Sequence, residues 1–258
     1  MKRETAYAKI NLALHVRERL PDGYHRIETI FAFCEEGDVL SAEPSDRLSL
    51  EIGGPFAGQL GDDSDNLVLR AARAVGATAA LRLDKRLPVA AGIGGGSADA
   101  AATLRLLGQG GEEGIAAQLG ADVPACLASR TVRGDGRGDQ LQPIDLPELS
   151  GIPVLLVNPG VKLSTAAVFS AWEGVDRGPL GDWKSGRNDL EAAASRLVPE
   201  IHAVLEALGA AEIARMSGSG ATCFGLFETS GERDRVADRI AEERPHWWTL
   251  RTQLRTCP

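Results

Sequence analysis

The sequence predicts an α+β protein, because strand-like and helix-like segments follow one another along the chain. Apolar residues alternate at residues 6–16, 48–52 and 81–87, which is typical of strands. A helix is expected from Leu67 to about Val75, with Asp65 or Asn66 as its N-cap and Gly76 after its end. The length of 258 residues suits one large domain or two ordinary ones, and residues 146–151 mark the predicted boundary.

The first predicted strand has two distinct faces. Ile10, Leu12, Leu14 and Val16 share one face if the segment is extended, while Lys9, Asn11, Ala13 and His15 share the other. This pattern predicts a half-buried strand. A turn is expected at Pro21-Asp22-Gly23, followed by an apolar segment at 27–33 and a break at Glu36-Gly37-Asp38.

The remaining elements follow from the same signals. One helix is expected to begin near Ser97, run to Leu107 and end at Gly108. Arg133 to Asp139 contains the tripeptide Arg-Gly-Asp twice, and is predicted to be a hairpin turn between two short strands. Asp62 to Asn66 faintly resembles a calcium loop, but a helix cap is the preferred interpretation. Further helices are expected at 112–119, 190–197, 200–208 and 232–243, and further strands at 152–157, 222–227 and 246–254.

Composition narrows the classes of function. The net charge is −8 and no long cluster of Lys and Arg is present, which argues against a nucleic-acid partner. Cys34, Cys126, Cys223 and Cys257 are far apart, so free thiols in a reducing compartment are expected rather than a zinc site. No apolar run has the length of a signal peptide or a membrane span, so no membrane partner is expected. We therefore expect a cytoplasmic location.

A glycine-rich segment between a predicted strand and a predicted helix indicates an anion site. Glycines allow the backbone to approach phosphate oxygens, and the first amides of a helix point at a bound anion. Ser97 adds a hydroxyl that can bond phosphate or reach Mg²⁺. The segment lacks the Lys-Ser/Thr pair of a P-loop and the glycine spacing of dinucleotide sites. A flexible turn before a serine-capped helix is the alternative. The residues assigned to ATP are Pro88, Val89, Ala90, Ala91, Gly92, Ile93, Gly94, Gly95, Gly96, Ser97 and Ala98.

Three separated motifs resemble those of the GHMP kinases: residues 8–12, residues 92–97 and residues 216–223. The segments 22–25, 28–31, 119–124 and 187–191 are similar to the branch of that family whose substrate is a cytidine diphosphate-linked polyol. The resemblance covers essentially the whole chain, in the same order.

The resemblance implies a two-domain GHMP kinase fold. Residues 1–150 would form an ATP-binding domain like domain 2 of ribosomal protein S5, and residues 151–258 a ferredoxin-like domain, with the substrate in a cleft between them. It also implies ATP-dependent phosphorylation of a hydroxyl on a small-molecule polyol, with Mg²⁺ as cofactor, by a monomer or weak homodimer. Ala98 stands where the family usually has a second serine, so the ligands of Mg²⁺ are left unassigned.

Two residues are expected to be catalytic by the same resemblance. Asp122 matches the aspartate that takes the proton of the attacking hydroxyl, whereas by its position alone it would be a helix N-cap. Lys9 matches the lysine beside that aspartate, whereas alone it would be a solvated lysine.

The resemblance also suggests substrate-binding residues. Tyr24 would stack on the cytosine and His25 would hydrogen-bond to its edge; a capped turn with an exposed aromatic is the alternative. Trp183 is the aromatic nearest before residues 188–191 and is the candidate for a second stacking ring. The substrate residues are therefore Asn11, Tyr24, His25, Asp122 and Trp183, with Gly218, Ser219 and Gly220 backing the phosphate site.

Two other functions remain open at this point. A different GHMP kinase, such as one acting on homoserine, would have no use for a cytosine-binding segment at Tyr24 and His25. A non-catalytic nucleotide-binding module would be expected to lack the base or the lysine, yet both Asp122 and Lys9 are present.

Overall fold

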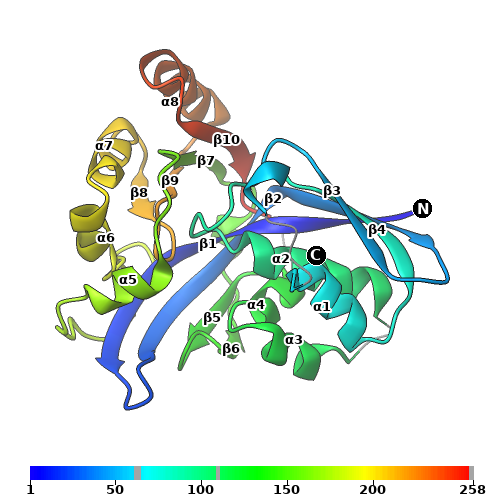
Figure 1. The fold of residues 1–258 in the computed structure, drawn as a ribbon. Helices are drawn as coiled ribbons and strands as arrows, with labels where there is room; N and C mark the ends of the chain where they lie inside the picture. The colour runs from blue at the N-terminus through cyan, green and yellow to red at the C-terminus, as the bar shows by residue number, and fades with distance from the viewer. Residues whose placement is uncertain (61–64, 109–110, 256–258) are drawn as a thin grey trace. The chain divides into compact units, whose positions relative to one another are not determined.

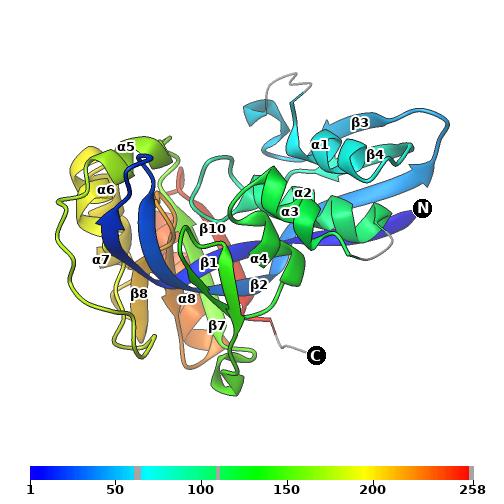
Figure 2. The same ribbon diagram turned by 90° about the horizontal axis from the view of Figure 1, so that it is seen from below.

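The computed structural model describes residues 1–60, 65–108 and 111–255, and it confirms the mixed α+β class (Figures 1 and 2). The chain forms two compact units. The first contains Met1–Lys9, Glu36–Val89 and Gly94–Ser129, and the second contains Ile10–Glu35, Ala90–Ile93 and Arg130–Pro258. Strands β1 (Lys2–Arg19) and β2 (His25–Pro44) pair with each other, and each contributes residues to both units.

The first unit contains part of a six-stranded sheet and a group of helices. Strand β3 (Ser49–Gly53) runs parallel to β4 (Ala79–Asp84), and β4 is antiparallel to the second half of β2. Helices α1 to α4 contact one another and form one group in Figure 1. The bounds are α1 Leu67–Ala74, α2 Gly95–Leu107, α3 Glu113–Leu119 and α4 Val123–Ala128, with a 3-10 turn, η1, at Ala57–Gln59.

The cap expected for α1 is confirmed. The Asn66 side chain accepts a hydrogen bond from the Val68 amide, and Gly76 follows the helix with a φ of 65°. The cap satisfies an amide that has no partner inside the helix, and the glycine adopts the left-handed conformation that ends it. The sequence signals at both ends therefore set the bounds of α1.

The second unit contains an antiparallel sheet in the order β10-β7-β9-β8. One of its two inner strands, β7, includes the fully buried residues Val154 to Val157, as expected for a continuous apolar run. Helices α7 and α8 contact this sheet, and α8 begins with a capping box formed by Thr229 and Glu232. The bounds are β7 Pro153–Asn158, β8 Ile213–Met216, β9 Cys223–Leu226, β10 Trp248–Gln253, α5 Thr165–Ser170, α6 Glu191–Leu197, α7 Glu200–Ala207 and α8 Ser230–Glu243.

The Arg-Gly-Asp repeat lies in a hairpin, as predicted. Strands β5 (Val132–Asp135) and β6 (Gln140–Pro143) pair antiparallel around it, and β5 also pairs with the first half of β2. A 3-10 turn, η2, follows at Pro147–Leu149. The hairpin therefore extends the β1–β2 pair within the second unit.

The prediction that β1 is half-buried is wrong, because both of its faces are covered. Lys9, Asn11 and His15 are only 3%, 2% and 2% exposed. A buried polar side chain is tolerated when it has hydrogen-bonding or ionic partners. The polar face of β1 is thus a buried polar face rather than a solvated one.

The predicted break at residues 36–38 is also wrong, because β2 continues through them. A Cβ atom built on Gly37 would lie 1.9 Å from the carbonyl oxygen of Ala6. The glycine is therefore required by close contact with the neighbouring strand, not by a turn. Asp38 is fully buried, and its carboxylate accepts the amides of Arg86 and Leu87.

Two helices and one strand have no counterpart among the sequence predictions, namely α4, α5 and β8, and neither do the 3-10 turns η1 and η2. Apart from β2, which continues well past the predicted segment 27–33, the predicted helices and strands agree with the structure to within a few residues. Cys257 and most of the Asp62–Asn66 segment lie outside the described residues. Within the described part of the chain, every helix is too short or too polar to cross a membrane.

Candidate active site

Lys9 and Asp122 form an ion pair in the first unit, with 3.0 Å between Lys9 Nζ and Asp122 Oδ2. Asp122 occupies the N-cap position of α4, but its side chain makes no capping hydrogen bond. The carboxylate is about one-third exposed, whereas the lysine side chain is almost fully buried. The structure therefore brings together the two residues expected to be catalytic, and the carboxylate is oriented toward the lysine instead of the helix.

The N-terminus of α2 lies against the same lysine. Gly94 is the N-cap of this 13-residue helix and has a φ of 65°. A Cβ atom at Gly94 would lie 3.0 Å from Lys9 Cε, so the glycine permits the contact. The first amides of the helix have no partner within it, and the helix dipole favours an anion there. Ser97 lies half-buried in the first turn, and Ala98 is buried.

A buried ionic cluster of Lys85, Asp38 and Asp99 supports the start of α2. Lys85 Nζ lies 2.5 Å from Asp38 Oδ2 and 2.7 Å from Asp99 Oδ2. A Cβ atom at Gly95 would lie 3.2 Å from Lys85 Nζ. The cluster therefore lies directly beneath the glycine-rich helix start.

The cluster holds more negative than positive charge in a buried place, and this shifts its pKa values. Burial raises the pKa of the Asp99 carboxyl to about 7, although Lys85 opposes the shift. Burial acts to lower the pKa of Lys85, but Asp99 and Asp38 outweigh it and the pKa is raised. The sequence predictions did not include this cluster. The signal for it was a single acid, Asp99, within a run of alanines.

In the second unit, residues 90–93 pack against residues 216–223, the third of the motifs that resemble those of GHMP kinases and here called the third glycine motif. The Ser217 hydroxyl donates to the Gly92 carbonyl at 2.9 Å and accepts from the Asn11 amide at 3.3 Å. A Cβ atom at Gly92 would lie 2.5 Å from the Ser217 carbonyl oxygen. The Thr222 amide donates to the Ala91 carbonyl at 3.2 Å. Backbone and hydroxyl groups thus fix this part of the loop.

Asn188 holds the third glycine motif through hydrogen bonds to its backbone. Its side-chain nitrogen donates to the carbonyls of Met216 and Gly218, at 2.7 and 2.8 Å. Its oxygen accepts the Leu190 amide at 3.0 Å. Both ends of the Asn188 side chain therefore form hydrogen bonds, and those to Met216 and Gly218 stabilise the turn at Gly218 to Gly220. The motif at 187–191 was noted in the sequence, but this role for Asn188 was not predicted.

Asn11 is buried next to that turn. Its side-chain nitrogen donates to the Thr29 hydroxyl at 2.8 Å, and Thr29 donates to the Ala13 carbonyl at 2.7 Å. A Cβ atom at Gly218 would lie 3.3 Å from the Asn11 side-chain oxygen. Asn11 is thus held in a defined orientation. Ser219 contacts the Thr165 hydroxyl at 2.8 Å.

Tyr24 and His25 lie at the β1–β2 turn of the second unit in different surroundings. Tyr24 is 58% exposed, whereas His25 is buried. Burial, with Arg19 nearby, lowers the pKa of His25, so the imidazole is neutral at pH 7. Arg19 Nε donates to His25 Nε2 at 3.3 Å, which leaves Nδ1 of the neutral ring as an N–H donor.

Two aromatic rings lie next to His25. The Phe169 ring centroid is 4.9 Å from that of His25, and the Trp172 centroid is 5.6 Å away. Trp183 has a different place, since it is only 4% exposed and its indole nitrogen donates to Glu148 at 3.4 Å. The structure therefore brings Phe169, and not Trp183, to the neighbourhood of His25. Phe169 was missed because α5, which carries it, was not predicted.

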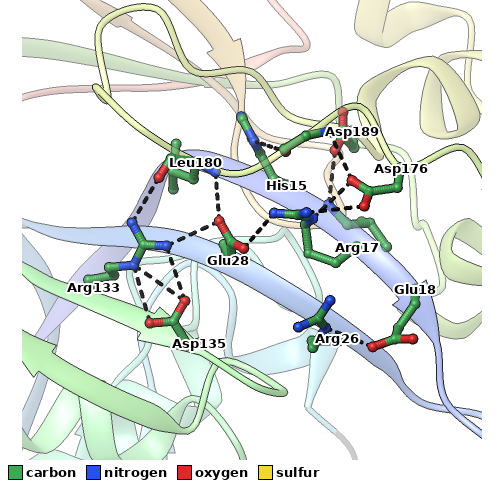
Figure 3. Close-up of polar contacts among 12 residues, drawn as sticks. His15, Arg17, Glu18, Arg26, Glu28, Arg133, Asp135, Asp176, Leu180 and Asp189 are labelled. Atoms are coloured by element: carbon green, nitrogen blue, oxygen red, sulfur yellow. Dashed lines mark hydrogen bonds and ion pairs between the residues drawn. The ribbon is translucent and has the colours of Figure 1, made fainter.

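A polar network holds residues 176–180 against β1, β2 and β5 in the second unit (Figure 3). Glu28 accepts hydrogen bonds from Arg17 at 2.7 Å, from Arg133 at 3.1 Å and from the Leu180 amide at 2.6 Å. Arg17 also pairs with Asp176 at 2.9 Å. A carboxylate shared by two guanidinium groups has a fixed position, so Glu28 organises the network.

The buried thiol near Asp122 has no nucleophilic character. Burial raises the pKa of Cys126 to about 12, and the Asp122 charge adds to the rise. The thiolate is the reactive form of cysteine, so Cys126 is a packing residue. Within the described residues, His, Cys, Asp and Glu form no group of three or more that could hold a metal ion.

Comparisons with known proteins agree with these features. Two family models match the chain, "GHMP kinases N terminal domain" over residues 66–130 and "GHMP kinases C terminal" over residues 176–246. A protein of Rhizorhabdus wittichii named 4-diphosphocytidyl-2-C-methyl-D-erythritol kinase is 56% identical, and the match covers 98% of this chain and 94% of that protein. A protein of Novosphingobium aromaticivorans with the same name is 51% identical, over 98% and 93% of the two chains.

Solved structures give the same result. A crystal structure of 4-(cytidine 5'-diphospho)-2C-methyl-D-erythritol kinase superposes with a TM-score of 0.83 at 32% identity, and the match covers 99% of this chain and all of that one. A mevalonate kinase structure has a TM-score of 0.66 at 10% identity, over 98% and 99% of the two chains, which is a likeness of fold alone.

Proposed function

Because the chain belongs to the GHMP kinase family, we propose that it transfers the γ-phosphoryl group of ATP to the 2-hydroxyl of 4-diphosphocytidyl-2-C-methyl-D-erythritol. This reaction is a step of the non-mevalonate, or methylerythritol phosphate, route to isoprenoid precursors. The relatives that carry this substrate in their name match nearly the whole chain at 44–56% identity. That agreement supports the substrate as well as the reaction type.

The Lys9–Asp122 ion pair is the observation that carries the proposal. In phosphoryl transfer to an alcohol, the protein mainly positions the reactants and stabilises charge. Asp122 would accept the hydroxyl proton as the oxygen attacks the γ-phosphorus and ADP leaves. Lys9 would orient the carboxylate and the reacting hydroxyl. A carboxylate that was only a helix cap would bond to the amides of α4, which Asp122 does not do.

The glycine-rich residues Pro88 to Ala98 would bind the phosphates of ATP. The N-terminus of α2 supplies amides and a favourable dipole. Ser217 and Thr222, on either side of Gly218 to Gly220, support the loop through hydrogen bonds to the carbonyls of Gly92 and Ala91. Mg²⁺ usually keeps several waters and is held by one or two protein oxygens together with the substrate phosphates. The Ser97 hydroxyl, in the first turn of α2, is the group that would reach a phosphate-bound Mg²⁺. The ion would neutralise charge on the phosphates.

Tyr24, His25 and Phe169 would bind the cytosine. Tyr24 offers an exposed ring for stacking, and neutral His25 has an N–H donor for the base edge. Phe169 replaces Trp183 as our candidate for the second aromatic, because its ring is next to His25. Asn11 would orient the polyol, since its side chain is held by Thr29.

Domain roles follow from the family. We assign residues 1–150 to ATP binding and residues 151–258 to the C-terminal domain, which the two family matches support by falling on either side of residue 150. The buried thiols of Cys126 and Cys223 support a reducing, cytoplasmic location.

An assay with the purified protein tests the function. We expect ADP release with ATP, Mg²⁺ and 4-diphosphocytidyl-2-C-methyl-D-erythritol, and none above background with homoserine or mevalonate. Release with either of those two, and none with the cytidine compound, would show that the chain is a different kinase of the family. The phosphorylated position is read by phosphorus NMR of the product.

A further inference from the structure

The turn of the β5–β6 hairpin contacts Tyr24. The guanidinium carbon of Arg137 lies 4.2 Å from the centroid of the Tyr24 ring. A guanidinium within about 6 Å of a ring centroid is attracted to the face of the ring, and its plane can stack there. One face of an otherwise exposed aromatic side chain is therefore covered by Arg137.

Asp22 links the two residues. One carboxylate oxygen of Asp22 pairs with Arg137 Nη2, and the other accepts the Tyr24 amide at 3.0 Å. The tight turn that carries Asp22 and Tyr24 is closed by a hydrogen bond in which the Leu20 amide donates to the Tyr24 carbonyl at 2.7 Å. Asp22 thus fixes the guanidinium relative to the backbone of Tyr24.

The hairpin that carries Arg137 is anchored both in its turn and along strand β5. The Ile27 amide donates to the Gly136 carbonyl at 2.7 Å. Arg133 pairs with Glu28 and donates to the Leu180 carbonyl at 2.9 Å, as Figure 3 shows. At the tip, the Arg137 amide donates to Asp139 at 3.0 Å. Arg137 is therefore presented to Tyr24 from a fixed support.

We propose that Arg137 is a positioning residue for nucleobase binding: it stacks on one face of Tyr24 and holds the ring so that the opposite face receives the base. That the base is cytosine rests on the proposed function. A ring that is already ordered loses less conformational freedom when the ligand binds. Arg137 acts through Tyr24 rather than on the diphosphate, because its charge is already paired with Asp22.

Fluorine NMR tests the contact without any ligand. The chain has only two tyrosines, Tyr7 and Tyr24, so 3-fluorotyrosine labelling gives two signals, which Tyr24→Phe assigns. Arg137→Ala should shift the Tyr24 signal and leave that of Tyr7 in place. Arg26→Ala is the matched control, since Arg26 is an exposed arginine of β2 paired with Glu18. A Tyr24 signal that does not move in Arg137→Ala would overturn the proposal.

Kinetics test the consequence for binding. Arg137→Ala should raise KM for the cytidine substrate about two- to fivefold, while kcat and KM for ATP stay unchanged. Arg137→Lys keeps the charge but not the planar stack, so it should rescue only part of the loss. An unchanged KM in Arg137→Ala, or full rescue by lysine, would contradict a stacking role.

A double-mutant cycle separates the two ways in which Arg137 could act. In a Tyr24→Ala background, Arg137→Ala should have no further effect on KM or on the affinity for CDP measured by calorimetry. A loss that persists undiminished there would mean that Arg137 contacts the ligand itself. If the unaltered enzyme neither binds CDP nor turns over, the proposed function and the cytosine assignment fail, and the fluorine signal alone decides whether Arg137 holds the ring.

Discussion

Asp122 shows how one side chain can serve either of two roles that its position permits. It stands at the start of α4, where an aspartate normally caps the helix. Its carboxylate instead pairs with a lysine that is buried on β1. Holding a carboxylate away from the helix amides leaves its oxygens for a lysine and a substrate hydroxyl. This choice of partner is the residue-level basis of the proposed chemistry.

Replacing Asp122 with asparagine should therefore greatly slow turnover and spare nucleotide binding. The substitution keeps the shape and removes the base, so we expect kcat to fall about a hundred- to ten-thousand-fold. The affinity for ATP, measured by calorimetry, should change less than about threefold. Glu51→Gln, an exposed carboxylate on β3, is the control and should keep full activity. Parallel losses of ATP binding and activity would mean that Asp122 has a structural role, and thermal unfolding of both variants would show it.

For single residues, the sequence predicted which ones belong to the candidate site better than it predicted which neighbours they contact. The motifs identified Lys9, Asp122, Tyr24 and His25 as candidates, and the structure pairs the first two. Trp183 was chosen by its distance along the chain from Asn188, but its ring is buried. Phe169 reaches His25 through α5, a helix of six residues that has no strong periodic signal. Which side chains of such short elements lie close together depends on the tertiary fold, so it cannot be predicted from their spacing along the sequence.

The glycine-rich loop is an element whose parts need glycine for different reasons. Gly92 has a φ of 76° and its α-carbon approaches the carbonyls of Ser217 and Gly220. Gly96 lies in the first turn of α2, where a Cβ atom would meet nothing closer than a methyl of Leu67 at 3.4 Å. One glycine is thus required by backbone contact, while the other is required only if a ligand approaches it.

Alanine at these two positions should therefore have different effects on stability. Gly92→Ala should lower the free energy of unfolding by about 1–3 kcal/mol, since it combines a left-handed φ with a clash against backbone oxygens. It should also weaken ATP binding. Gly96→Ala should leave stability unchanged or raise it by up to about 1 kcal/mol, as alanine does within a helix. Denaturant unfolding of both variants is the measurement, and equal destabilisation would contradict the difference between the two sites.

Elements with both a cap and a periodic pattern were predicted closely, and those that depend on distant contacts were not. α1 has its asparagine cap and its final glycine, and its bounds agree with the prediction. β2 was divided at Gly37 because glycine between two charged residues indicates a turn. In the fold, that glycine is required by Ala6 on the neighbouring strand, which no local signal reveals.

For the molecule as a whole, the buried cluster beneath α2 links stability to pH. Asp99 has a pKa of about 7 in the folded state, above the usual value of 3.8 for an aspartate. The folded state therefore binds a proton more tightly than the unfolded state does. Where the folded state binds more protons, the free energy of unfolding falls as the pH rises. The contribution of this group is favourable below about pH 4 and is lost progressively between about pH 4 and 7.

Asp99→Asn should remove this dependence. The amide keeps an oxygen that can accept from Lys85 but does not titrate, so the unfolding free energy of the variant should fall less than that of the parent between pH 4 and 7. Urea unfolding at several pH values measures it. Asp234→Asn, on the surface of α8, is the control and should follow the parent curve. Parallel curves for the parent and Asp99→Asn would show that Asp99 is ionised throughout this range.

The repeated passage of the chain between its two compact units has a consequence for synthesis. The first unit has all its residues once Ser129 has been made, whereas the second also needs the segment that begins at Arg130. Residues 10–35 are therefore synthesised early, but their contacts with β5 and Asn188 can form only after those much later residues have been made. Neither unit is encoded by one continuous stretch of gene, so a single recombination event cannot exchange one unit for that of a relative.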